Sequence, residues 1–200
     1  RMSGEEWTPE SDGNFARGDM IPLQRTWTLW YFKPRTGMEE REPNHPPLQR
    51  LEDFDTVQDF WSCFNALPSP LTLASKQCLH MMKRGISPDS SDPANERGGF
   101  WTVRVEKDRA EEAWQTLCLA CIGEQFACVM PRQDAICGLT IKAGTEKIIF
   151  QIWNKEEAHK GAVYDRIKTI LPNKMVDVEK IFYRTNAEEV RKSNEKAGGN

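Results

Sequence analysis

The sequence lacks the apolar run of roughly 20 residues that a membrane-spanning helix needs. It has three histidines among 200 residues and a formal net charge of −3, so it has no broad excess of Lys and Arg. A nucleic-acid groove needs such an excess, although a small basic pocket does not. The strings GxSxG, HExxH and the P-loop are absent. These absences argue against a membrane protein, a broad nucleic-acid binder and an enzyme.

The composition is sufficient for one folded domain. An apolar fraction of 38% and seven tryptophans can form one hydrophobic core within 200 residues. The first residues are polar and acidic, which predicts no secretory signal. Residues 1–18 are rich in Gly, Ser, Asp and Glu and indicate a flexible arm, and residues 187–200 read as a loose tail. We therefore expect the domain to extend over residues 19–186.

The six cysteines lie mostly in apolar segments, as buried free thiols do. Without a secretory signal they indicate a reducing compartment, the cytoplasm or the nucleus. Cys118 and Cys121, followed by Cys128 and Cys137, have a spacing to test as a zinc site. However, the first pair lies in a segment that reads as helix, and no second tight pair follows. Buried thiols are the favoured interpretation, and we expect no metal and no cofactor.

Apolar periodicity predicts three helices and a set of strands. Helices are expected over 55–67, with Asp55 or Thr56 as the N-cap, 109–126 and 158–170. Strands are expected over 26–34, 79–83, 99–107, 137–154 as a hairpin turning near Gly144, and 175–185. The charged, proline-containing segment 35–51 reads as a loop. This order indicates an α+β fold with the helices packed on one face of a curved antiparallel sheet.

Alternation along the strands leaves one sheet face polar and basic. Leu139 and Ile141 alternate with Thr140 and Lys142, and Trp153 falls on the polar side. A tryptophan among lysines suits an aromatic, phosphorylated ligand, because the ring can stack and the ammonium groups can bind phosphate. The alternative is that a loop covers Trp153 and the lysines are merely solvated.

The helices also carry apolar residues outside their main stripes. On a helical wheel, Val57 and Trp61 lie at the edge of the stripe of the first helix, and Leu119 lies well off the stripe of the second. These residues either form an apolar patch for a partner helix or belong to the core.

Several strings together resemble the eukaryotic translation initiation factor 4E family. They are IPLQRTWTLWYFKP, FDTVQDFWSCFNAL, NERGGFW, IGEQF and CGLTIK, across roughly residues 21–183. The resemblance implies a curved antiparallel β-sheet backed on its convex face by three helices. It also implies binding of the 7-methylguanosine cap of mRNA on the concave face. On the convex face it implies a helical motif of a 4G-type scaffold or a 4E-binding protein.

The partner-binding positions of that family match this chain well. The resemblance implies the set Pro22, Leu23, Val57, Trp61, Leu119 and Gly123. Three of these, Val57, Trp61 and Leu119, are the residues that the helical wheels leave outside the stripes. Two independent arguments therefore indicate the same surface.

The cap site departs from the family pattern. Family members stack the methylated base between two tryptophans and read its edge with a glutamate. Ser90 and Ser91 stand at the second tryptophan and the glutamate, with Asp92 close by as a replacement carboxylate. The loop expected to carry the first tryptophan offers Met38 as its nearest polarizable side chain. One stacked base contributes roughly 1–3 kcal/mol, so losing both rings predicts weak cap binding. Such departures are similar to those of divergent paralogues in trypanosomatid parasites.

Other residues of the cap site are kept or replaced. Trp153 matches the family tryptophan that contacts the methyl group. Phe100, which stands where the family has a phosphate-binding arginine, is a candidate for stacking on the base. The phosphate candidates are Arg104, Lys142, Lys147 and Lys155.

Two functions stay open. The first is a cap-binding translation initiation factor with an altered base-stacking site that recruits a 4G-type scaffold. The second is a protein-interaction module or translational regulator of the same fold that binds the cap weakly or not at all. An enzyme is not expected, although a Cys63–His80 pair is the arrangement to check for one. We expect a location in the cytoplasm or the nucleus and no membrane partner.

Overall fold

The computed structural model describes residues 20–34, 47–130, 135–171, 176 and 180–198. The strands are β1 (Pro22–Phe32), β2 (Leu48–Thr56), β3 (Cys78–Lys83), β4 (Gly99–Val105), β5 (Ile136–Ala143), β6 (Ile148–Asn154) and β7 (Phe182–Thr185). The helices are α1 (Val57–Ala66), α2 (Ala110–Ile122), α3 (Lys160–Ile170) and α4 (Asn186–Gly198). Short 3-10 turns are η2 (Pro70–Thr72), η3 (Lys107–Arg109), η4 (Ala127–Val129) and η5 (Glu157–His159).

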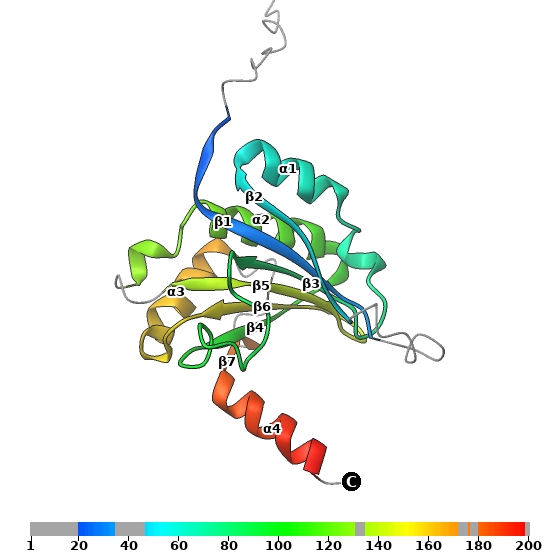
Figure 1. Ribbon diagram of the computed structural model, residues 1–200, viewed down its shortest axis with the longest axis vertical. Helices are drawn as coiled ribbons and strands as arrows, with labels where there is room; N and C mark the ends of the chain where they lie inside the picture. Colours follow the sequence, from blue (N-terminus) through cyan, green and yellow to red (C-terminus); the bar gives the residue numbers. More distant parts are fainter. Residues whose placement is uncertain (1–19, 35–46, 131–134, 172–175, 177–179, 199–200) are drawn as a thin grey trace, which may run out of the picture.

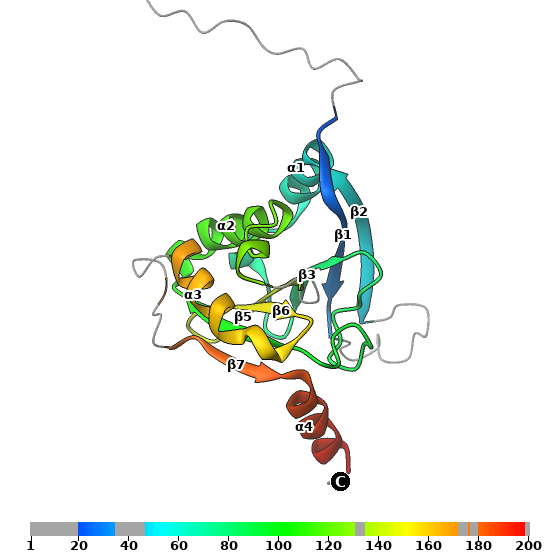
Figure 2. The same ribbon diagram turned by 90° about the vertical axis from the view of Figure 1, so that its left-hand side faces the viewer.

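The strands form a single sheet in the order β2-β1-β3-β5-β6-β4-β7. Each neighbouring pair is antiparallel. Helices α1, α2 and α3 lie on one side of this curved sheet (Figures 1 and 2). The expected α+β class, with a curved antiparallel sheet backed by three helices, is confirmed, and a fourth helix follows β7.

The main core lies between the sheet and these helices. Trp101, Val103 and Val105 of β4 point into it, as alternation predicts, and so do Leu139 and Ile141 of β5. All five are buried. The other face of the sheet carries no helix from α1 to α3, and we call it the open face (Figure 2).

Helix α1 begins where its sequence predicts. Thr56 is the N-cap, and its hydroxyl accepts a hydrogen bond from the backbone N–H of Asp59 at 3.1 Å. Thr56 rather than Asp55 therefore fills this role. Phe60 is buried, and its ring lies 5.4 Å from that of Phe64. Phe64 in turn stacks near Trp114 of α2, with the ring centroids 6.5 Å apart, so aromatic contacts join the first two helices.

Strand β2 corrects the expectation of a loop that continues to residue 51. It begins at Leu48 and pairs with β1, with Trp27 opposite Phe54. It is an edge strand in which Phe54 is the only fully buried side chain. Such a strand shows little apolar alternation, which is why its charged sequence reads as a loop.

Helix α4 corrects the expectation of a loose C-terminal tail. The hydroxyl of Thr185 accepts a hydrogen bond from the backbone N–H of Glu188 at 3.2 Å, and the Glu188 carboxylate accepts one from the Thr185 N–H at 3.1 Å. This reciprocal pair is a capping box that starts the helix. The helix extends away from the sheet (Figures 1 and 2). Within the described residues, no helix is long and apolar enough to cross a membrane.

Candidate functional site

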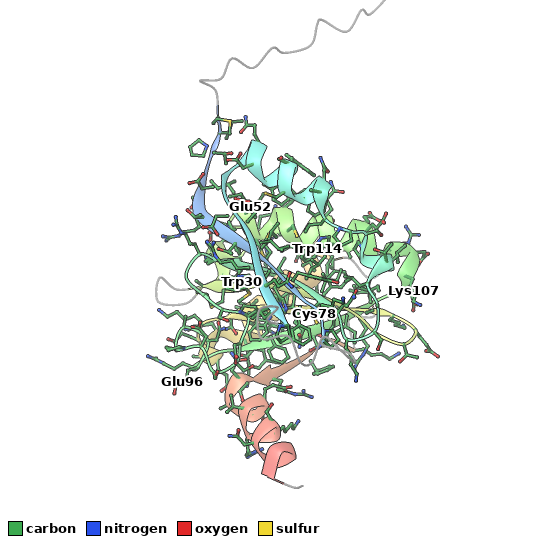
Figure 3. All side chains as sticks on the ribbon, turned by 45° about the vertical axis from the view of Figure 1, so that its right-hand side comes forward. Trp30, Glu52, Cys78, Glu96, Lys107 and Trp114 are labelled. Atoms are coloured by element: carbon green, nitrogen blue, oxygen red, sulfur yellow. The ribbon has the colours of Figure 1, made fainter. Side chains whose placement is uncertain are left out.

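The register of the strands arranges the open face into three rows of side chains. Cross-strand partners share a face, so each row can be followed from β1 to β4 or beyond. The middle row is Trp30, His80, Thr140, Gln151 and Thr102. The cationic row, on one side of it, is Phe32, Cys78, Lys142, Ile149 and Arg104. The covered row, on the other side, is Thr28, Met82, Gly138, Trp153, Phe100 and Arg184. Figure 3 labels Trp30 and Cys78 along the strands and Trp114 among the helices.

A hydrogen-bonded chain links the middle and covered rows. The indole Nε1–H of Trp153 donates to the hydroxyl of Thr140 at 2.9 Å. The same hydroxyl lies 2.8 Å from Nδ1 of His80. Because the Thr140 oxygen already accepts from the indole, its own proton is available for Nδ1, which makes Nδ1 the acceptor and Nε2 the protonated nitrogen of a neutral ring. Burial, and secondarily the charge of Lys142, lowers the pKa of His80 to about 3, in agreement with the neutral form.

The centre of the covered row is part of an apolar cluster rather than an open stacking surface. Phe100 and Trp153 are buried with ring centroids 4.9 Å apart, and they share a cluster with Met82 and Cys137. Ile86, from the loop that follows β3, packs against this cluster. The surroundings of Trp153 therefore agree with the alternative interpretation, in which a loop covers this tryptophan. Phe100 likewise presents almost no ring surface to a ligand.

The loop over residues 85–98 uses its carboxylates to hold its own backbone. The two carboxylate oxygens of Asp92 accept hydrogen bonds from the N–H groups of Ser87, at 2.9 Å, and Ala94, at 2.8 Å. Asp89 accepts from the N–H and hydroxyl of Ser91, both at 2.8 Å. Such Asx contacts fix a turn. The predicted replacement carboxylate, Asp92, is therefore already engaged in this structure.

The buried side-chain amide of Asn95 also stabilises this loop. The Asn95 amide group donates to the carbonyl oxygens of Ser87 and Asp89, at 2.9 and 2.8 Å. Asn186, at the start of α4, donates to the Asn95 carbonyl at 2.7 Å. Ser90 is half-buried and Ser91 is exposed at the loop surface. The loop thus has an ordered conformation without an aromatic clamp.

The predicted phosphate-binding cations differ in their surroundings. Lys142 is half-buried in the cationic row and forms no ion pair with the residues that the structure describes. Lys147 pairs with Glu106 at 2.5 Å, so its charge is offset. The Arg104 guanidinium lies 5.2 Å from the ring centroid of Phe182, and Lys155 is exposed. The structure therefore brings Arg104 and Lys142 into one row, while Lys147 is engaged elsewhere. Met38 lies outside the described residues.

The predicted partner-binding residues gather on the opposite side of the sheet. Pro22 of β1 lies opposite Thr56, and the N–H of Val57 donates to the Ile21 carbonyl at 2.9 Å, so the start of β1 lies beside the start of α1. Val57, Trp61, Leu119 and Leu23 are half-buried, and Pro22 and Gly123 are exposed. Gly123 caps α2, and its N–H donates to the Leu119 carbonyl at 2.9 Å.

Within the described part of the chain, the cysteines are not gathered into a metal or catalytic site. Cys118 and Cys121 are buried in the main core, whereas Cys137 belongs to the cluster on the open face. Burial raises the pKa of both core thiols. Among the described residues, no three His, Cys, Asp or Glu side chains are grouped as metal ligands. Cys63 lies on α1 and His80 on the open face, so the two do not form a catalytic pair.

Comparison with known proteins places this architecture in one family. The sequence profile described as "Eukaryotic initiation factor 4E" matches residues 22–199. The chain belongs to the eukaryotic initiation factor 4E family. It is 33% identical over 142 residues to the eukaryotic translation initiation factor NCBP of Oryza sativa subsp. japonica, a match that covers 71% of this chain and 60% of that protein. It is 32% identical over 155 residues to the eukaryotic translation initiation factor 4E-1 of Nicotiana tabacum, covering 78% of this chain and 68% of that protein. The chain thus spans about 60% of the length of some curated 4E relatives.

Solved 4E-family structures have the same fold. Caenorhabditis elegans eIF4E-3, in a complex with the 4E-binding protein Mextli and a cap analogue, aligns with a TM-score of 0.70 and 25% identity, covering 86% of this chain and 96% of that chain. Ascaris suum eIF4E-3 with an m7G cap aligns with a TM-score of 0.70 and 29% identity, covering 83% of this chain and 91% of that chain.

Sequence reasoning on this 4E-family chain missed the middle row as a unit. Alternation placed Thr140 on the polar face, but it could not show that Thr102, Thr140 and Gln151 lie side by side across three strands. Trp30 and His80 complete the row through the register of β1 and β3. Cross-strand register depends on pairing between distant segments, and a single sequence does not reveal it.

Proposed function

We propose that this chain is a cap-binding translation initiation factor that holds the methylated 5′ end of mRNA on its open face. The observation that supports this most directly is the three-row open face, where polar side chains lie beside the cations Lys142 and Arg104. Related eIF4E-3 proteins have been solved with cap and cap analogue. An aromatic nucleotide with a phosphate tail matches this combination of groups.

The base-stacking site is proposed to differ from the two-tryptophan clamp. Ser90 and Ser91 supply no ring, and Phe100 and Trp153 are packed against each other. Each missing stack removes roughly 1–3 kcal/mol, which predicts weak affinity for the minimal cap. A second candidate, an interaction module that no longer binds the cap, is favoured by the engaged carboxylates of Asp89 and Asp92.

Titration with 7-methyl-GTP, followed by tryptophan fluorescence, tests cap binding. Unmethylated GTP is the control. Saturable quenching by the methylated nucleotide alone supports the cap-binding function. Identical responses to both nucleotides up to millimolar concentration would favour the interaction module.

We further propose that the helix side binds a helical segment of a 4G-type scaffold or a 4E-binding protein. Val57, Trp61 and Leu119 are half-buried apolar side chains beside exposed Pro22 and Gly123. Such a patch suits an amphipathic partner helix. Mextli is a practical probe, because C. elegans eIF4E-3 was solved in complex with it.

A Trp61→Ala variant tests this surface. Truncating a central tryptophan of an interface commonly costs about 2 kcal/mol or more, so Mextli binding should weaken about 30-fold. Trp153→Ala, on the opposite face, is the matched control. Unchanged Mextli affinity in a folded Trp61→Ala protein would contradict the proposal that the helix side binds this partner.

A further inference from the structure

The middle row contains largely buried residues whose polar groups make no hydrogen bond with the described residues. His80, Gln151 and Thr102 have exposed fractions of 7%, 8% and 5%. The Nε2–H of His80, the Gln151 amide and the Thr102 hydroxyl make no hydrogen bond with the part of the chain that the structure describes. The indole Nε1 of Trp30 is also buried without a partner.

A fully buried polar group without a partner costs roughly 1–3 kcal/mol, and of these four groups the Trp30 indole is the one that is fully buried and unpaired among the described residues. The four groups of the row are neighbours across the sheet. Trp30 is opposite His80, His80 is opposite Thr140, and Gln151 is opposite both Thr140 and Thr102. Thr140 is already satisfied by Trp153 and His80. Neighbouring strands lie about 4.8 Å apart, so a nucleobase on this row reaches only part of it.

The neighbouring row indicates where an anionic group of that ligand would lie. Lys142 follows Thr140 by two residues on β5, and Arg104 follows Thr102 by two residues on β4. Residues two apart on a strand share a face and are separated by roughly 7 Å. A planar polar ring on the middle row therefore places an attached phosphate near Lys142 and Arg104.

We propose that the middle row reads the hydrogen-bonding edge of the nucleobase, with Gln151 as the specificity-determining residue. This inference rests on the proposed cap-binding function. It places base recognition on the open face of the sheet instead of on the loop over residues 85–98. The carboxylates of Asp89 and Asp92 are bonded to that loop itself.

The chemistry of an amide determines which atoms of guanine are read. A carboxylate only accepts hydrogen bonds, so it pairs with two donors, N1–H and the N2 amino group. The Gln151 amide has one acceptor and one donor group, so it matches the adjacent N1–H and O6 atoms. The Gln151 amide then makes no hydrogen bond with the N2 amino group. Gln151 recognition therefore accepts a base that lacks the amino group or carries methyl groups on it.

The unmodified protein provides the first test. Isothermal titration calorimetry compares 7-methyl-GTP with 7-methylinosine triphosphate, which lacks only the N2 amino group. Recognition by Gln151 predicts dissociation constants within about threefold of each other. Loss of a hydrogen bond to a carboxylate would cost about 1.5–3 kcal/mol, or more than tenfold in affinity, and that result would overturn the proposal.

Substitutions at Gln151 provide the second test. Gln151→Leu keeps the apolar volume and should weaken 7-methyl-GTP binding at least about fivefold, because N1–H and O6 lose their partner. Gln115→Leu, an exposed position on α2, is the matched control. Gln151→Glu should introduce a preference for 7-methyl-GTP over the inosine analogue. Affinity of Gln151→Leu equal to that of the unmodified protein, with an unchanged urea midpoint, would also overturn the proposal.

The outcomes distinguish a failure of cap binding from a failure of base recognition by Gln151. If the unmodified protein binds neither methylated nucleotide, the cap-binding function itself fails and this inference falls with it. If it binds 7-methyl-GTP but requires the N2 amino group, cap binding stands and Gln151 is not the reader.

Discussion

The buried imidazole of His80, on the open face, contributes to the stability of the fold in its neutral form. It is buried and accepts a hydrogen bond from Thr140 while Thr140 accepts one from Trp153, so the neutral ring is part of the packing. Burial and the charge of Lys142 lower its pKa to about 3. In the unfolded chain the same ring has a pKa near 6.5. Between these values the unfolded chain binds a proton that the folded protein does not bind.

This difference predicts that the protein loses stability as the pH falls below about 6.5. Because the unfolded state binds more protons in that window, the free energy of unfolding rises with pH. Between pH 7.5 and 5.5 the contribution of His80 should fall by about 1.4 kcal/mol. Urea unfolding at both pH values measures it. His80→Gln should remove this part of the pH dependence and His159→Gln should keep it, whereas equal slopes in all three proteins would refute the assignment.

Lys142 and Lys147 should contribute unequally to phosphate binding. Glu106 offsets the charge of Lys147, whereas Lys142 has no ion pair among the described residues. Lys142→Ala should weaken 7-methyl-GTP binding about tenfold, corresponding to about 1.4 kcal/mol for one charge-assisted contact. Lys147→Ala should change it about twofold or less. Affinity for 7-methylguanosine, which has no phosphate, is the control, and a larger loss for Lys147→Ala would contradict this order.

At the scale of elements, the loop over residues 85–98 depends on one aspartate. Both Asp92 oxygens accept backbone hydrogen bonds, and the loop carries Ile86 onto the Trp153 cluster. Asp92→Ala leaves two N–H groups without these acceptors and should destabilise the fold by about 1–3 kcal/mol. Chemical denaturation measures the loss, with exposed Asp108→Ala as the control. Faster amide hydrogen exchange of Ser87 and Ala94 in Asp92→Ala would locate the change, and protection equal to that of the parent would count against it.

Local patterns in the sequence predicted the elements whose signals are local. The N-cap at Thr56, the alternation of β4 and the hairpin of β5 and β6 all depend on neighbouring residues, and the structure has them. The capping box at Thr185 is a local signal as well, but the polar helix that follows it has no apolar stripe to draw attention to it. Strand β2 is an edge strand defined by its pairing with β1, which alternation does not show.

The candidate site was less predictable because it depends on long-range packing. Trp153 was placed correctly on the polar face, but its burial depends on Phe100 and on Ile86 from another segment. The pairing of Lys147 with Glu106 joins residues that flank β6 and β4, across a register that the sequence does not reveal. The proposed partner-binding patch was easier to predict, since helical periodicity alone leaves Val57, Trp61 and Leu119 at the margin of the core.

At the scale of the whole molecule, the two proposed surfaces lie on opposite sides of one sheet. Successive residues of β4, β5 and β6 point to opposite faces of the sheet. Those such as Val103, Ile141 and Phe150 pack beneath α1–α3, and those such as Thr102, Thr140 and Gln151 form the open face. Antiparallel pairing joins the strands into one sheet, and this sheet separates the two surfaces. A ligand on one side therefore makes no direct contact with residues on the other.

This separation predicts that the two binding activities are nearly independent. Trp61→Ala removes a ring on α1 that contacts the rings of Phe60 and Phe64, neither of which lies in the rows of the open face. Its affinity for 7-methyl-GTP should stay within about twofold of the parent, because distant sites without shared partners usually add within about 0.5 kcal/mol. Gln151→Leu should likewise keep its affinity for Mextli. Calorimetry of both ligands with both variants completes the comparison. A shift above tenfold in either crossed measurement would mean that binding on one face changes the packing beneath the other.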